Sequence, residues 1–590
     1  MGMRWSLDSL YSNFNDENFC KDYEKLNSEI ENIRNWCEGN FKTTESASEK
    51  LQFFIKKQNE FYDLFSKLSS YAHLTLSVDA KNETALKIQD ELEEKATELT
   101  KPLVLFEKWV SSIDNIEDII SENPFLNEHG FYIKQILEKN KYLLSEKEEV
   151  IISKMKNTGS NAWNKLQELL TSTLLVDITL DGELKHLPLP VVRNMAFDRN
   201  QSIRKSAYEA ELKSYEKIAD SSAAALNGIK GEVITISKLR GYKSPLEKTL
   251  LDSRMDQETL DAMISAIKEY LPVFRRYYRK KAEILGHDNG LPFYDLFAPV
   301  GDADMKFTYD EAREFIIKNF RSFSEKLANL AERAFNEQWI DAEPRQGKRG
   351  GAFCSNLHPI KESRILANFT GSFNNVSTLA HELGHAYHGY CLKDETYLNS
   401  RYPMPIAETA SIFCETIIKN AALKDASKEE AFTILESDLQ GAAQVIVDIY
   451  SRFLFESELF RRREKGSLSV NELNEIMLNA QREAYGNGLD NSYLHPYMWV
   501  NKPHYYYPER NFYNFPYAFG LLFAKGLYAE YINRGAEFVE DYDRLLSVTG
   551  KMKIADITSL MGIDIHSIDF WRSSLNIVAE DIEKFINLCN

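Results

Sequence analysis

Cysteine and long hydrophobic segments are both scarce in this sequence. Six cysteines occur in 590 residues, and no two of them have the close spacing of a metal-binding pair, which is typical of free thiols in a reducing compartment. No run of 18 apolar residues occurs, and the first residues lack an apolar segment of signal-peptide length. We therefore expect a cytoplasmic protein with no membrane partner.

Positive charge is also in short supply. The chain has 89 acidic residues against 71 lysines and arginines, a net charge of −18, whereas a nucleic-acid-binding protein needs a basic face. Two local clusters of basic residues, 275–281 and 461–463, are expected to be solvated helix faces. We find no internal repeat and no low-complexity segment, and we expect no nucleic-acid partner.

Helical patterns dominate the rest of the chain. The clearest amphipathic segments are 21–36, 47–67, 87–110, 202–239 and 256–285. They predict an N-terminal helical lobe over residues 1–200 and a second, catalytic lobe over residues 201–590, and 43% hydrophobic residues suffice for sizeable cores. Within the first lobe, the β-branched segment 174–184 carries Asp181-Gly182, which predicts a small hairpin.

One short segment carries the signature of a metal site. On a helix, His381-Glu382-Leu-Gly-His385 places two imidazoles one turn apart on the same face, with a carboxylate between them in sequence. This spacing lets both rings converge on one zinc ion at about 2.1 Å, while Glu382 projects beside the metal as a base. Asn375 or Ser377 is expected to cap the helix. The alternative is an ordinary amphipathic helix whose histidines are satisfied within the fold.

A third ligand is predicted on a second helix, opened by Pro405. Glu408, Ser411 and Glu415 fall there at i, i+3 and i+7, on one face of an otherwise apolar helix. Glu408 would complete a site of two histidines and one glutamate for one zinc ion per chain, with the fourth position open to water. Glu415 is expected to orient the ligands from behind. A competing pattern needs histidine at position 391, which is Cys391.

Other segments near the motif have roles that the sequence leaves open. His388 is either a substitute ligand or, since it follows His385 by three residues, a residue that orients ligands or contacts substrate. The segment 364–370 is the clearest strand, and it is either an edge that pairs with an extended peptide substrate or an inner strand of a small sheet. The glycine-rich segment 341–356 is expected to form a flexible loop near the substrate.

This set of motifs resembles the oligoendopeptidase F branch of the thimet oligopeptidase family of zinc metallopeptidases. The resemblance covers nearly the whole chain and includes the zinc motif, followed after 22 intervening residues by Glu408. Further matching segments are Trp5-Ser-Leu-Asp, 225–231, 240–242, 294–299 and 347–354. The resemblance implies a mainly α fold with two helical lobes around a deep substrate channel and a small β-sheet next to the zinc helix in a zincin-like core. It also implies His381, His385 and Glu408 as zinc ligands and Glu382 as general base.

A late segment of the chain is dense in histidine and tyrosine. Aromatic packing explains most of these residues, but a tetrahedral oxyanion beside zinc needs a second donor, which a tyrosine hydroxyl or histidine ring supplies. The family carries a histidine followed by two tyrosines after its zinc site, for which His504, Tyr513 and Tyr517 are the best matches. The spacing departs from that of the thimet oligopeptidase branch, which leaves the donor open to Tyr506 or Tyr507 as substitutes.

We therefore expect a zinc-dependent endopeptidase that hydrolyses internal peptide bonds of short unfolded oligopeptides, with a zinc-bound water activated by Glu382. A carboxypeptidase on the same scaffold is one alternative, because Lys348, Arg349 and Arg510 are available for a terminal carboxylate. An aminopeptidase is another, although the Gly-x-Met-Glu-Asn element of related aminopeptidases is missing. A peptide-binding protein without catalysis is the third. No feature of the sequence indicates an oligomeric state.

Overall fold

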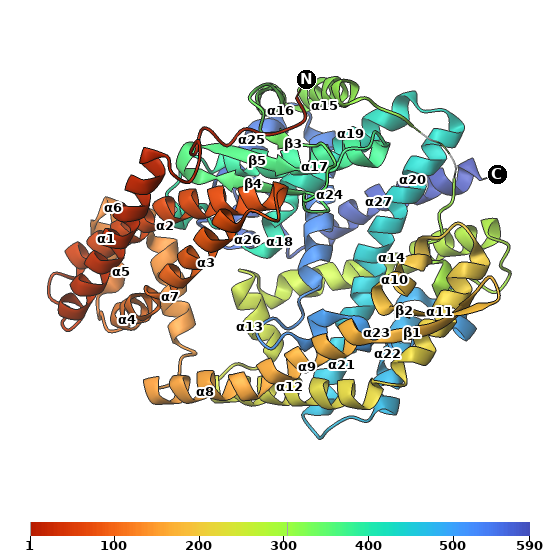
Figure 1. Ribbon diagram of the computed structural model, residues 1–590, viewed down its shortest axis with the longest axis horizontal. Coiled ribbons are helices and arrows are strands. Elements are labelled where there is room, and N and C mark those ends of the chain that lie inside the picture. The colour runs from red at the N-terminus through yellow and green to blue at the C-terminus, as the bar shows by residue number, and fades with distance from the viewer. Residues whose placement is uncertain (1, 302, 304, 590) are drawn as a thin grey trace. The chain divides into compact units, whose positions relative to one another are not determined.

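Two small sheets stand among a large set of helices in this protein (Figure 1). The computed structural model describes residues 2–301, 303 and 305–589. Its strands form a two-stranded and a three-stranded sheet, which confirms the expected mainly α class. Within these described residues, no helix is both long enough and apolar enough to cross a membrane.

The elements gather into two compact units, each assembled from three separate parts of the chain. Unit 1 contains Met1–Tyr142, Asp304–Lys424 and Glu530–Ile563. Unit 2 contains Leu143–Ala303, Asp425–Ala529 and Asp564–Asn590. The division into lobes at residue 200 stays a prediction.

The N-terminal part of unit 1 consists of amphipathic helices. α1 (Glu17–Asn40) packs against α2 (Ala47–Val78), α3 (Glu83–Thr97) contacts α2, and α4 (Thr100–Val110) contacts α1. Their buried leucine, isoleucine and phenylalanine side chains form one core. The helix expected over 87–110 is therefore two helices. The other helices of unit 1 away from the metal motif are α5 (Ile116–Glu122), α6 (Pro124–Glu128), α7 (Gly130–Asn140), α15 (Tyr309–Phe323), α16 (Glu325–Asn336), α25 (Glu537–Ser547) and α26 (Ile554–Ser559).

The three-stranded sheet of unit 1 has the order β3, β5, β4. β5 (Glu362–Leu366) pairs parallel with β3 (Ile340–Asp341) and antiparallel with β4 (Phe353–Leu357). Of the two roles expected for segment 364–370, the structure therefore selects the inner strand and rejects the edge. β4 lies at an edge of the sheet, and α17 (Phe373–Cys391) contacts both β4 and β5 (Figure 1).

A capping box starts α17. The Ser372 hydroxyl accepts a hydrogen bond from the backbone N–H of Asn375, and the Asn375 side chain accepts one from the backbone N–H of Ser372. The prediction of Asn375 or Ser377 as the cap is therefore wrong by a few residues. Asn375 still contributes, as the reciprocal partner of the cap.

The helix expected from Pro405 is divided in two. α18 (Met404–Ala407) ends just before Glu408, and α19 (Thr409–Asp425) begins just after it. Glu408 itself has φ −90° and ψ 4°, a conformation of the bridge region that is common in turns. Its side chain therefore leaves the backbone at a helix junction and not from a helix interior.

The small sheet of unit 2 is the expected hairpin, made of β1 (Leu175–Leu180) and β2 (Glu183–Pro188). Its two-residue turn has positive φ at both positions, 53° at Asp181 and 82° at Gly182. A type I′ turn requires this conformation, which explains why Asp-Gly is a strong hairpin signal.

Long helices make up the rest of unit 2. The helix expected over 202–239 is interrupted, giving α11 (Gln201–Tyr215) and α12 (Ala219–Arg240), whereas 256–285 forms the single expected helix, α14 (Gln257–Ile284). A π-helical turn, Gln444–Asp448, joins two others. The remaining helices are α8 (Glu146–Thr158), α9 (Ser160–Thr173), α10 (Leu189–Asn194), α13 (Pro245–Asp252), α20 (Lys428–Ala443), α21 (Ile449–Arg463), α22 (Val470–Tyr485), α23 (Met498–Asn501), α24 (Phe515–Arg534) and α27 (Ile568–Leu588).

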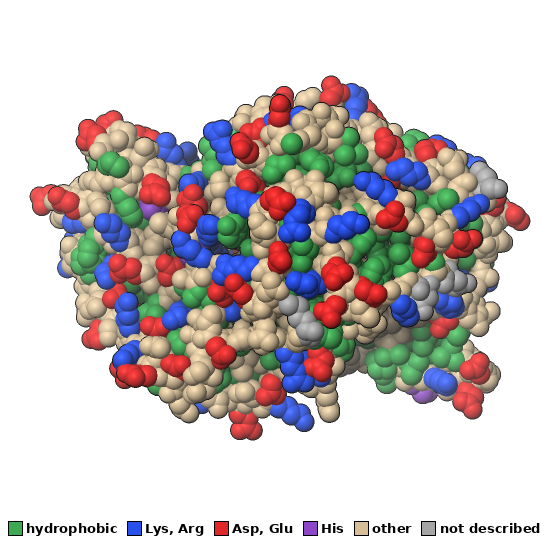
Figure 2. Space-filling model, turned by 90° about the horizontal axis from the view of Figure 1, so that it is seen from above, with side chains coloured by type: hydrophobic (Ala, Val, Ile, Leu, Met, Phe, Trp, Pro, Cys, Tyr) green, Lys and Arg blue, Asp and Glu red, His purple; other side chains and the backbone are tan. Residues whose placement is uncertain are grey.

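Acidic and basic side chains are interspersed on the face drawn in Figure 2, so the net negative charge is not gathered in one patch of that face. In the second basic cluster, Arg461 and Arg462 pair with Glu458 and are partly exposed, as a solvated helix face predicts. For the first cluster the prediction is wrong at Lys281. This side chain has no exposed surface, and its ammonium lies 2.6 Å from a carboxylate oxygen of Glu436.

Candidate metal centre

Three side chains of unit 1 converge at the motif. The Nε2 atoms of His381 and His385 lie 3.2 Å apart, and Glu408 Oε2 lies 3.3 Å from the first and 3.4 Å from the second. The two histidines come from α17 and the glutamate from the junction of α18 and α19. The structure therefore brings together the three residues that the sequence proposed as ligands.

These three atoms fit a zinc ion. In a triangle with sides near 3.3 Å, each corner lies about 1.9 Å from the centre (side divided by √3), which is close to the ordinary zinc–ligand distance of about 2.0–2.1 Å. Two imidazoles and one carboxylate are also the donor set of many catalytic zinc sites. Among the described residues, the group able to hold a metal consists of His381, His385 and Glu408.

Gly384 lies in the motif between the two histidines. Because it has no side chain, α17 can pack closely against α19. A Cβ atom at this position would lie 2.5 Å from the carbonyl oxygen of Ala410 and 2.6 Å from Cα of Ser411. Both are backbone atoms of α19, which cannot rotate away as a side chain can. The sequence analysis assigned no role to this residue, because its partner lies outside the local pattern.

Gly384→Ala is expected to separate Glu408 from the two histidines. Overpacking of this kind costs roughly 1–3 kcal/mol, and we expect lower bound metal, measured by elemental analysis, and a lower midpoint of thermal unfolding. Gly441→Ala is the matched control, since a Cβ atom there meets nothing within 4 Å. Full metal content in the Gly384 variant would show that α17 and α19 can move apart without cost.

Hydrogen bonds fix the orientation of the ligands. Glu415 accepts a hydrogen bond from Nδ1 of His381, which leaves Nε2 free for a metal. The Ser411 hydroxyl donates to Glu408 Oε2 at 2.8 Å, and His385 makes a hydrogen bond with the backbone of Ala407. Such partners set the tautomer of a metal-binding histidine and hold it in place.

Burial and charge act differently on the three ligands. Burial alone would raise the pKa of Glu408, but its hydrogen bond with His381 and the charges of the imidazoles lower it to about 2. Burial lowers the pKa of His385 to about 4. These two ligands therefore have the forms that bind zinc, an anion and a neutral imidazole. For His381, burial alone would lower the pKa, but the hydrogen bonds with Glu408 and Glu415 raise it to about 10, so a metal has to displace the proton from Nε2.

Glu382 is a buried carboxylate with one free oxygen. The residue is only 5% exposed, and Oε2 has no hydrogen-bond partner among the residues described. Burial first, and then the negative charges of Glu408 and Glu415, raise its pKa to about 7 against the opposing effect of His381. A carboxylate of this kind is suited to accept and return a proton near neutral pH.

His388 does not belong to the group of three converging side chains. It is fully buried, its Nε2 lies 2.9 Å from the Thr549 hydroxyl, and its ring stacks on Tyr402 with 4.0 Å between centroids. Burial lowers its pKa to about 3. The structure therefore gives it a packing role behind α17 and not the role of a substitute ligand.

The glycine-rich segment is anchored, contrary to the expected flexible loop. The buried Lys348 ammonium lies 2.8 Å from Asp341 and donates to the backbone oxygens of Asp341, Glu343 and Ala367. The backbone N–H of Arg349 donates to Ser77 in α2. These contacts fix the segment that leads into edge strand β4.

The predicted oxyanion donors form a cluster in unit 2. The rings of His504 and Tyr513 lie 4.9 Å apart between centroids, and the hydroxyls of Tyr513 and Tyr517 lie 3.4 Å apart. Tyr507 also contacts this cluster. Tyr506 is fully buried, which removes it as a substitute donor. Because the candidate ligands belong to unit 1, the catalytic role of this cluster stays a prediction.

Known proteins with similar sequences are peptidases by name. The family model described as peptidase family M3 matches residues 194–577, and the model described as oligopeptidase F matches residues 112–175. Oligopeptidase PepF of Bacillus subtilis is 25% identical over 599 residues, covering 99% of this chain and 87% of the relative. An oligoendopeptidase F homolog of Borreliella burgdorferi is 25% identical over 608 residues, covering 98% of each chain.

Solved structures share the fold. A structure from Chlamydophila abortus matches with a TM-score of 0.87 at 22% identity, over 99% of this chain and 98% of that chain. Oligoendopeptidase-F from Enterococcus faecium matches with a TM-score of 0.70 at 19% identity, over 97% of this chain and 99% of that one. The match to the M3 family model spans well over half of this chain. The chain is therefore a metalloendopeptidase that belongs to peptidase family M3, in the oligoendopeptidase F branch.

Proposed function

We propose that this protein is a zinc-dependent endopeptidase that hydrolyses internal peptide bonds of short unfolded oligopeptides. The observation that carries the proposal is the triangle of two imidazole nitrogens and one carboxylate oxygen, with sides of 3.2–3.4 Å, adjacent in sequence to a buried glutamate with a free oxygen. The names of the relatives, oligopeptidase and oligoendopeptidase, agree with it.

In this proposal each residue has one task. His381, His385 and Glu408 hold the zinc ion, which when bound lowers the pKa of a coordinated water and polarises the scissile carbonyl. Glu382 accepts the proton of the attacking water at its free oxygen and then delivers it to the leaving amine. Glu415 keeps the His381 ring in the tautomer with Nδ1 protonated.

His504, Tyr513 and Tyr517 are the groups that we propose to donate hydrogen bonds to the oxyanion. The close approach of the two tyrosine hydroxyls, at 3.4 Å, supports a shared function. A buried donor aimed at the developing charge contributes a few kcal/mol to catalysis.

β4 is the strand that we propose to align the substrate. It lies at the edge of its sheet and contacts α17, whereas β5 is paired on both sides. An extended peptide added to such an edge makes backbone hydrogen bonds that do not depend on its side chains. This mode of binding suits an enzyme that cleaves many short sequences.

Cleavage of end-blocked peptides distinguishes the endopeptidase from its alternatives. We expect internal cleavage of internally quenched peptides that carry an N-acetyl group and a C-terminal amide, with rates that blocking changes less than threefold. Lys348 is already engaged by Asp341 and three backbone oxygens, so it is not free for a terminal carboxylate. Loss of terminal residues from free peptides, with blocked peptides intact, would replace this proposal by an exopeptidase.

A further inference from the structure

Unit 2 contains a cavity that the proposed reaction does not use. Its volume is about 340 Å³, within the range of small-molecule sites. Four stretches of the chain line it, 190–211, 277–297, 440–448 and 485–502, and all of them belong to unit 2. None of its lining residues is a candidate metal ligand or a member of the His504 cluster.

Aromatic rings form much of the wall of this cavity. The rings are those of Phe197, Tyr208, Tyr277, Tyr278, Phe293, Tyr294, Phe297 and Tyr485. Cavities lined by aromatic rings and a few convergent polar groups are typical of sites for small ligands. The rings therefore favour a ligand with an apolar or aromatic body.

The charged groups of the wall do not balance. Arg204 lies 2.7 Å from Asp295, and Arg193 lies 3.2 Å from Glu211. Asp448 is paired with Arg452. In contrast, Lys502 lines the same cavity without a hydrogen-bonded carboxylate among the described residues, and Asp448 and Glu211 act on its ammonium only through their charges. Two of the cations on the wall are thus paired with a carboxylate and one is left over.

His495 is a second polar group of the cavity, and its ring nitrogens have no close hydrogen bond among the residues described. The residue is 2% exposed. Its nearest carboxylate oxygen, on Glu211, lies 3.6 Å from Nε2. A buried polar atom without a partner is costly, so a ligand that accepts a hydrogen bond from this ring would remove a real penalty.

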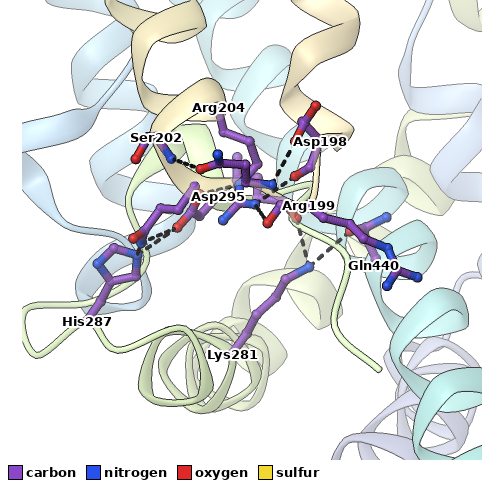
Figure 3. Close-up of polar contacts among 11 residues, drawn as sticks. Asp198, Arg199, Ser202, Arg204, Lys281, His287, Asp295 and Gln440 are labelled. Atoms are coloured by element: carbon purple, nitrogen blue, oxygen red, sulfur yellow. Dashed lines mark hydrogen bonds and ion pairs between the residues drawn. The ribbon is translucent and has the colours of Figure 1, made fainter. Parts of the chain in front are cut away.

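Hydrogen bonds hold one wall of the cavity rigid (Figure 3). Arg204 binds Asp295 and also donates to the backbone oxygens of Asp198 and Arg199. The Nε2 atom of His287 makes a further hydrogen bond with Asp295, at 2.7 Å. A preformed site loses less entropy on binding than a flexible one.

Two helices of the wall, α14 and α20, are fixed in the same way. Lys281 donates to Leu296, Glu436 and Gln440, which ties α14 to α20. The π-helical turn Gln444–Asp448 follows α20 and contributes both of its end residues to the wall. π-helical turns are rare in proteins, and a large share of those that occur lie at functional sites.

We propose that this cavity binds a small organic carboxylate with an apolar or aromatic body, whose carboxylate pairs with Lys502 and accepts a hydrogen bond from His495. The ring-lined part of the wall takes the body of the ligand. The ligand carries one negative charge, because one positive charge on the wall has no paired carboxylate. Two sources provide this chemistry, a free amino acid with a large apolar side chain and the C-terminal residue of a short peptide.

The protonation of Lys502 agrees with this assignment. Burial, and then the charge of Arg452, lower the pKa of its ammonium to about 7. A carboxylate beside it would favour the charged form again. The residues of this cavity are distinct from the candidate metal ligands, and the proposal does not depend on the endopeptidase reaction.

Isothermal titration of the zinc-loaded full chain with N-acetyl-L-phenylalanine and with its amide tests this site. We expect the acid to bind at least tenfold more tightly than the amide, because only the acid pairs with Lys502. The same preference is expected after zinc is removed by a chelator. Equal binding of acid and amide, or binding of neither, would overturn the proposal without the need for any variant.

Lys502→Met is expected to weaken binding of the acid at least tenfold while leaving the amide unchanged. Lys213→Met is the matched control, since Lys213 is an exposed lysine of α11. Because Lys502→Met removes a cation without a partner, its thermal unfolding should match that of the wild type. Binding that Lys502→Met leaves intact, or that disappears with the zinc, would place the ligand elsewhere and overturn the proposal.

A comparison of phenylalanine with glycyl-phenylalanine on the metal-free chain identifies the source of the ligand. Tighter binding of the free amino acid indicates a site for amino acids, and tighter binding of the dipeptide indicates a site for peptide ends. Either order supports the site, provided that Lys502→Met weakens both.

Discussion

Glu382→Gln is expected to lower kcat on an end-blocked peptide by about 10³- to 10⁴-fold, since a positioned acid and base contributes up to this much to a reaction. Glutamine has nearly the same shape, but it cannot accept the proton of the attacking water. The three candidate ligands are unchanged, so bound zinc should stay at one per chain. The measurement pairs the rate of an internally quenched peptide with elemental analysis of the same preparation.

Glu83→Gln is the control for this variant, because Glu83 is an exposed residue in the first turn of α3. It should retain the rate and the zinc of the wild type. A Glu382→Gln enzyme that keeps a tenth or more of its activity would remove Glu382 as the base. Loss of the zinc together with the activity would instead show that Glu382 is needed to build the site.

The parts of this fold that sequence predicts are those decided by a few neighbouring residues. The spacing of His381 and His385 places both rings on one side of a helix wherever that helix packs. Asp181-Gly182 forms its turn because glycine and aspartate tolerate positive φ, whatever lies nearby. The helix expected over 256–285 begins where Asp256 accepts a hydrogen bond from the backbone N–H of Thr259, only three positions along.

The parts that escaped prediction depend on partners far along the chain. Lys281 sits in a run of basic residues that suggests a solvated face, but its partner Glu436 is 155 residues away. Gly384 needs its missing Cβ only because the backbone of Ala410 lies against it. The inner position of β5 likewise follows from its pairing with β3, a strand of two residues that no local pattern announces.

The candidate site combines both kinds of information. Its two histidines follow from spacing alone, and its glutamate was selected from two acids, Glu408 and Glu415, on one predicted face. The structure then gives those acids different tasks, because the helix is broken at Glu408 and continues through Glu415. Glu408 Oε2 lies near both Nε2 atoms, whereas Glu415 touches the opposite nitrogen of His381. Of the two glutamates predicted on one helical face, Glu408 is thus a candidate ligand, and Glu415 is a hydrogen-bond partner of the ligand His381.

This division of tasks predicts different losses for the same substitution at the two positions. Glu408→Gln removes the anionic ligand, and we expect bound zinc to fall below a tenth per chain and activity to fall at least ~10³-fold, because a zinc site of this kind needs all three donors. Adding zinc in moderate excess should not restore the rate.

Glu415→Gln is the matched comparison, since it removes one charge from the same face without removing a donor. Loss of such an outer partner weakens metal binding by about 10- to 100-fold, so this variant should lose zinc on dialysis and regain activity when zinc is added. Titration of both apo variants with zinc, followed by peptide cleavage at each step, measures the difference. Equal loss at the two positions, or a Glu408 variant that recovers with zinc, would mean that Glu408 is not the third ligand.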